Sequence, residues 1–119
     1  MPLRGIRGAI DVPNDEAEVV IQATSRLLNA ILETNPSLHP ADLASVLFTT
    51  TKDIHTVYPA QAARQMGWND VPLLCVQEMS VPGSLERVVR VLAHWNTELP
   101  QTAIRHVYLD NAAKLRPDL

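Results

Sequence analysis

Hydrophobic and polar positions along the chain predict five strands and two helices. Over residues 16–33 the apolar residues recur with helical spacing, on a face formed by Val19, Val20, Ala23, Leu27, Leu28, Ile31 and Leu32. A shorter helix is predicted over residues 58–66, with Pro59 in its first turn and Gly67 at its C-terminal end. Strand-like runs occupy residues 3–10, 45–51, 71–79, 87–95 and 104–109. We expect an α+β fold with one domain spanning residues 1–119.

The predicted strand at residues 87–95 is apolar on both of its faces. Its two alternating sets of side chains are Val89, Ala93 and Trp95, and Val88, Leu92 and His94. Two helices are enough to cover only one face of a five-stranded sheet, so the other face needs a different cover. A second copy of the chain is the simplest source of that cover. The pattern therefore predicts a homo-oligomer whose sheets pack together.

Three charged residues interrupt the apolar strand-like runs. Arg90 lies within residues 88–92, Arg7 within residues 6–10, and Glu78 ends the run at residues 73–78. A guanidinium stays protonated in proteins, so burying one without an anion is costly. The three charges therefore indicate one polar pocket. Two alternatives are open for Arg90: an internal ion pair with Glu78, or an anionic ligand held by Arg90 and Arg7 while Glu78 accepts a hydrogen bond from a hydroxyl.

Overall charge and composition restrict the kinds of molecule that such a pocket would bind. The net charge is −3, which argues against nucleic-acid binding. Eight arginines stand against two lysines, and arginine is the better residue for two-point recognition of carboxylates. Only one cysteine is present, and no apolar stretch approaches the ~20 residues of a membrane helix. We expect a cytoplasmic protein that does not contact membranes.

Other kinds of site have weaker support in the sequence. The histidines, which show no metal-ligand spacing, are His39, His55, His94 and His106, so no metal or cofactor is expected. Cys75 with His106 is a conceivable nucleophilic pair, but a lone buried cysteine usually packs as a small apolar residue. Residues 49–51, all threonine, fit ordinary strand chemistry. Tyr108 is either a phenolic hydrogen-bond donor in the pocket or a packed aromatic.

Five stretches together resemble the AroH class of monofunctional bacterial chorismate mutases. These stretches are residues 4–9, 58–64, 71–79 with 90, 104–109 and 115–119, and they span nearly the whole chain in order. The resemblance implies a homotrimer in which each subunit contributes a mixed sheet with flanking helices. The sheets would pack into a pseudo-α/β-barrel core, with the active sites at the subunit interfaces. This agrees with the uncovered sheet face inferred from residues 87–95.

The resemblance also implies a reaction, the rearrangement of chorismate to prephenate on the route to phenylalanine and tyrosine. That rearrangement is pericyclic and unimolecular, so it needs no nucleophile, metal or cofactor. The enzyme must hold a flexible dianion in its reactive shape. It must also stabilise the negative charge that grows on the ether oxygen, for which a fixed guanidinium is well suited.

Site roles follow from the matched positions. Arg90 would contact the ether oxygen and a carboxylate, while Arg7 and Tyr108 would hold the other end of the substrate. Glu78 would accept a hydrogen bond from the ring hydroxyl, with Cys75 in contact nearby. The substrate-binding set that the resemblance implies is Tyr58, Ala60, Gln61, Arg64, Leu73, Leu74, Leu115 and Arg116.

Two positions in that set depart from the family pattern. Gln61 stands where the family often has a lysine, and Tyr58 where phenylalanine is common.

Two other functions stay open. One alternative is a small imine or enamine deaminase of similar trimeric architecture, which also holds a carboxylate with arginine. The other is a non-catalytic module that binds a small carboxylate with the same side chains.

Overall fold

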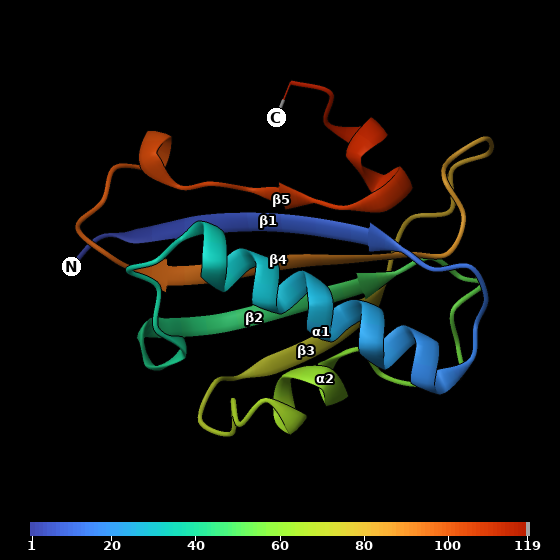
Figure 1. The fold of residues 1–119 in the computed structure, drawn as a ribbon, viewed down its shortest axis with the longest axis horizontal. Coiled ribbons are helices and arrows are strands. Elements are labelled where there is room, and N and C mark those ends of the chain that lie inside the picture. Colours follow the sequence, from blue (N-terminus) through green and yellow to red (C-terminus); the bar gives the residue numbers. More distant parts are fainter. Residues whose placement is uncertain (119) are drawn as a thin grey trace.

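The computed structural model, which describes residues 1–118, has a mixed five-stranded sheet with two helices packed against one face (Figure 1). The strands are β1 (Leu3–Asp11), β2 (Leu43–Thr50), β3 (Leu73–Gln77), β4 (Val88–Asn96) and β5 (Val107–Tyr108). The helices are α1 (Ala17–Thr34) and α2 (Ala60–Gln65). The described residues also form three short 3₁₀ helices: η1 (Pro40–Asp42), η2 (Gln101–Ala103) and η3 (Asp110–Leu115).

The strands lie in the order β3-β2-β4-β1-β5, so β4 is central, and β1 and β5 from the two ends of the chain lie side by side at one edge of the sheet. β4 runs antiparallel to both of its neighbours, β1 and β2, whereas β3 pairs parallel with β2 and β5 parallel with β1. In this register Arg90 stands between Ala9 on β1 and Thr49 on β2, and Ala9 pairs with Tyr108. The register therefore brings side chains from widely separated segments into one row.

Packing between α1 and the sheet forms the main core. The buried helix residues Val20, Leu27, Leu28 and Ile31 cover strand residues such as Ile6, Phe48 and Trp95. Gly8 on β1 permits this close packing. A Cβ at that position would lie 3.0 Å from Cδ1 of Ile31 and 3.1 Å from the backbone oxygen of Val107, so no larger residue fits without a shift.

The opposite face of the sheet, called here the open face, carries no long helix within residues 1–118. Leu74 and Val76 of β3 are 58% and 43% exposed on it. The short helix η3 lies over this face, where Ala112 packs on Ala9 and Val88 in a small buried cluster. The prediction of two helices on one face is therefore confirmed. None of the helices in residues 1–118 combines the length and the apolar character needed to cross a membrane.

Three predicted elements are shorter in the structure than in the sequence pattern. The strand predicted at residues 71–79 forms only over Leu73–Gln77. The predicted helix at residues 58–66 forms only over Ala60–Gln65, with Pro59 before it and Gly67 left-handed (φ +89°) after it. The strand predicted at residues 104–109 is reduced to Val107–Tyr108. The side chain of Asn35 hydrogen-bonds to both backbone groups of Arg105. Its Oδ1 accepts from the N–H at 3.0 Å, and its Nδ2 donates to the carbonyl at 2.9 Å. Side-chain bonds thus replace the expected strand ladder there.

Candidate functional site

A cavity of about 370 Å³ opens on the open face and collects four predicted site residues. Each comes from a different part of the sheet: Arg7 from β1, Arg90 from β4, Tyr108 from β5, and Glu78 from the residue just after β3. The other lining residues are Gly8, Thr49, Val91 and Leu92. The three charges that interrupt apolar runs in the sequence therefore do line one pocket.

Arg90 and Glu78 form a loose ion pair inside this cavity. Nε of Arg90 lies 3.6 Å from Oε2 of Glu78, and the two side chains are 30% and 34% exposed. The same carboxylate oxygen accepts a hydrogen bond from Oγ1 of Thr49 at 2.8 Å. Nε of Arg90 is itself buried, and within residues 1–118 it has no hydrogen-bond partner. An unpaired buried donor is rare in proteins and is a place where a ligand acceptor would be stabilised.

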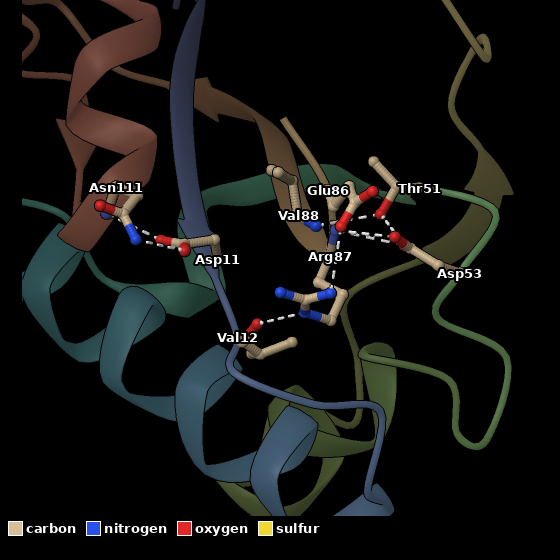
Figure 2. A network of polar contacts seen from close by, with 8 residues as sticks. All are labelled: Asp11, Val12, Thr51, Asp53, Glu86, Arg87, Val88 and Asn111. Atoms are coloured by element: carbon tan, nitrogen blue, oxygen red, sulfur yellow. Dashed lines mark hydrogen bonds and ion pairs between the residues drawn. The ribbon is translucent and has the colours of Figure 1, made fainter. Parts of the chain in front are cut away.

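A polar network fixes the chain at the start of β4, two residues before Arg90 (Figure 2). The backbone N–H of Arg87 donates to both carboxylate oxygens of Asp53, at 3.1 and 3.2 Å, and Nε of Arg87 donates to the carbonyl of Val12 at 3.0 Å. Thr51 accepts from the N–H of Val88 at 3.0 Å and donates to Asp53. Arg87 is held in the left-handed region (φ +51°), which side chains other than glycine rarely adopt. The network therefore ties the ends of β1 and β2 to β4.

Arg7 is placed by an unusual backbone contact at the edge of the sheet. Its N–H donates to Nδ1 of His106 at 3.0 Å, just before the parallel pairing of β1 and β5 begins. Burial lowers the pKa of His106 below its ordinary value, and the charges of Arg116 and Arg7 lower it further. His106 is consequently neutral near pH 7, with Nδ1 as the acceptor.

The C-terminal segment brings two further predicted residues close to Tyr108. The guanidinium of Arg116 lies 5.9 Å from the centroid of the Tyr108 ring, within the range of a cation–π contact. A bidentate hydrogen bond to Asp118, at 2.9 and 3.0 Å, raises the pKa of Arg116. Leu115 packs against the buried cluster of Ala9 and Ala112. Arg116 thus lies beside Tyr108, which lines the cavity, with its charge paired to Asp118.

Most of the remaining predicted residues lie apart from this cavity, in or near the start of α2. Tyr58, Gln61 and Cys75 line a separate cavity of about 460 Å³. Arg64 is exposed on α2, whereas Ala60 is buried in the core. Among the β3 residues, Leu73 and Cys75 pack against the core, while Leu74 points to the open face. One chain alone therefore does not bring this group into the cavity of Arg90.

Cys75 has neither the partner nor the environment of a nucleophile within one chain. Burial raises the pKa of its thiol, although a hydrogen bond from the backbone of Ala60 and the charge of Arg64 oppose that shift. His106 lies beside β5 at one edge of the sheet, and Cys75 lies in β3 at the other edge. The nucleophilic alternative is therefore not supported. Among residues 1–118, no group of three His, Cys, Asp or Glu side chains is placed to hold a metal ion.

Known proteins match this chain over nearly its whole length. The family described as chorismate mutase type I matches residues 3–119. "Chorismate mutase AroH" of Thermus thermophilus is 55% identical over 117 residues, covering 98% of this chain and 96% of that protein. "Chorismate mutase AroH" of Bacillus subtilis (strain 168) is 46% identical over 120 residues, covering 100% and 94%.

A solved structure extends the likeness from sequence to fold. The chorismate mutase from Clostridium thermocellum superposes with a TM-score of 0.90 at 43% identity, covering 92% of this chain and 97% of that one. The resemblance read from the five sequence stretches is confirmed by these matches. The chain belongs to the type I chorismate mutase family and is an isomerase of that kind.

Proposed function

We propose that the chain rearranges chorismate to prephenate in the cavity lined by Arg7, Glu78, Arg90 and Tyr108. The observation that carries the proposal is the buried Nε of Arg90, which has no hydrogen-bond partner among residues 1–118, in a cavity lining that also contains Arg7. A dianionic substrate supplies the acceptors that these cations lack. Family membership selects chorismate from among small dianions.

The chemistry proposed here depends on positioning and on charge. Within one substrate molecule the ether C–O bond breaks while a C–C bond forms, so no group is transferred to or from the protein. Arg90 stabilises the negative charge that develops on the ether oxygen, and Arg7 with Tyr108 holds a carboxylate end. Glu78 has its Oε1 free of the bond to Thr49, and it accepts a hydrogen bond from the ring hydroxyl.

A homotrimer with sites at its interfaces is the assembly we propose. Two features support it: the exposed apolar side chains of Leu74 and Val76 on the open face, and the separation of the Tyr58–Cys75 group from the Arg90 cavity. In such a trimer Tyr58, Gln61, Arg64 and Cys75 of one copy complete the cavity of its neighbour. Phenylalanine and tyrosine biosynthesis in the cytoplasm is the proposed setting.

The experiment that tests the function follows chorismate added to purified protein in buffer with EDTA. The product is identified by NMR, with Arg90→Ala measured alongside. We expect rapid conversion to prephenate by the wild type and loss of that conversion in the variant. If chorismate raises the melting temperature without being consumed, the carboxylate-binding module is favoured instead. Ammonia release from an amino-acid-derived imine would favour the deaminase.

A further inference from the structure

We infer that Thr49 is a positioning residue of this site, which holds the carboxylate of Glu78 so that Arg90 stays available to the substrate. The inference rests on the proposed function and assigns a role to a residue that the sequence pattern places in ordinary strand chemistry. Thr49 lines the cavity and stands directly opposite Arg90 in the β2–β4 pairing.

Glu78 is attached to β2 at two points. Its backbone N–H donates to the carbonyl of Thr50 at 2.8 Å, and its Oε2 accepts the Thr49 hydroxyl at 2.8 Å. Because threonine is β-branched and stiff about χ1, its hydroxyl is a donor with little freedom to move. The carboxylate is therefore oriented by the strand and does not depend on Arg90 for its position.

Arg90 would otherwise be the natural partner of this carboxylate. Arginine and carboxylate tend to form short, often bidentate pairs with distances of roughly 2.7–2.9 Å. Here the Nε–Oε2 distance is 3.6 Å, beyond a hydrogen bond, and Oε2 is already occupied by Thr49. Nε of Arg90 is left as a buried donor without a partner in residues 1–118. The Thr49 hydroxyl thus keeps the Glu78 carboxylate close to the Arg90 guanidinium but prevents a hydrogen bond between them.

Removal of the hydroxyl has a defined consequence. Oε2 of Glu78 loses its donor, and a movement of less than about 1 Å would bring it within hydrogen-bonding distance of Nε of Arg90. The substrate would then have to break an internal pair before Arg90 could meet the ether oxygen. Since that contact is made chiefly in the transition state, kcat should fall more than KM rises.

The test compares Thr49→Val with Thr49→Ser by steady-state turnover of chorismate. Valine keeps the shape but removes the hydroxyl, and we expect kcat/KM to fall on the order of 10- to 100-fold. Serine restores the donor and should return kcat/KM to within about threefold of wild type. Thr24→Val is the matched control, because it removes a buried hydroxyl bonded to Val20 in α1, outside the cavity lining. Melting temperatures of all variants are recorded; if Thr49→Val does not fold, Thr49→Ala replaces it.

A second arm asks whether Thr49 acts through Glu78. In a Glu78→Ala background, Thr49→Val should cost little further activity, because the carboxylate it orients is gone. A full additional loss in that background would overturn the inference, as would wild-type kinetics for Thr49→Val or equal damage from serine and valine. An inactive wild type would instead overturn the proposed function, and the inference with it.

Discussion

Arg90 and Glu78 lie 3.6 Å apart in one cavity wall without forming a hydrogen bond. The distance keeps the two opposite charges close enough to limit the cost of burying the guanidinium. It also leaves the Nε–H of Arg90 for another acceptor. The sequence left two alternatives for Arg90, an internal ion pair with Glu78 and an anionic ligand held by Arg90 and Arg7. The loose pair has a feature of each, because the carboxylate lies close while a donor of Arg90 stays without a partner among residues 1–118.

Lysine at position 90 should not replace arginine. Arg90→Lys keeps the charge but loses the planar donors, so we expect kcat to fall on the order of 10²–10³-fold. Steady-state kinetics would show this, with the exposed Arg105→Lys as the matched control. A variant with near-wild-type kcat would indicate that positive charge alone is sufficient.

Substitution of Cys75 should be tolerated. Its raised thiol pKa and its distance in the fold from His106 argue for a contact residue. We predict that Cys75→Ser keeps kcat within about tenfold of wild type, measured by chorismate turnover. Total loss of turnover in a folded Cys75→Ser protein would return the cysteine nucleophile to consideration.

Loss of the Asp53 carboxylate should affect both stability and activity. In Asp53→Ala the N–H of Arg87 loses its acceptor, which we expect to cost about 1–3 kcal/mol in the free energy of unfolding. The start of β4 would loosen, and kcat should fall because Arg90 is two residues further along that strand. Urea denaturation at a fixed protomer concentration measures the first effect. Asp70→Ala, a surface substitution of the same kind, should leave both quantities unchanged.

Acid should weaken the edge of the sheet through His106. Its folded pKa lies below the ordinary value of 6.5, so the unfolded chain binds the proton first as pH falls. Stability should therefore drop as pH decreases from about 6.5 through the folded pKa, and level off below it. His106→Asn keeps an acceptor for the N–H of Arg7 but does not titrate. Its denaturation midpoints should vary less over this pH range than those of wild type or of the exposed His39→Asn.

Mixed oligomers offer a test of the proposed interface sites. Arg90→Ala and Arg64→Ala remove residues from the two separate groups, and we expect each variant alone to have low activity. After the two are unfolded and refolded together, about one quarter of the interfaces would combine intact groups by random assortment. Recovery of activity in the mixture would support sites shared between copies. No recovery, despite mixing verified by mass spectrometry, would argue for sites contained within one chain.

Charged residues in apolar strands were the part of the site that the sequence could predict. The cost of burying Arg7, Glu78 and Arg90 made one shared pocket a reasonable expectation, and they line one cavity. Thr49 and Asp53 could not be recognised in this way, because threonine and aspartate are common in strands and turns. Their importance depends on the pairing of β2 with β4, which the sequence pattern does not specify.

Element boundaries were less predictable than element types. The fifth strand shortens because the side chain of Asn35, seventy residues away from Arg105 along the chain, takes the backbone groups that a ladder would use. The division of the site residues into two groups was also hidden, because it depends on which face of β3 each side chain occupies. Cys75 and Leu74 are adjacent in sequence but face opposite sides of the sheet.

Gly8 makes the wall between the hydrophobic core and the cavity only one peptide layer thick. On the core side, Ile31 of α1 occupies the space that a side chain at position 8 would need. On the other side, Gly8 itself lines the cavity. A core substitution in α1 therefore acts on the floor of the site almost directly. Substitution of Ile31 should alter kcat or KM even though that residue belongs to a helix on the far face of the sheet.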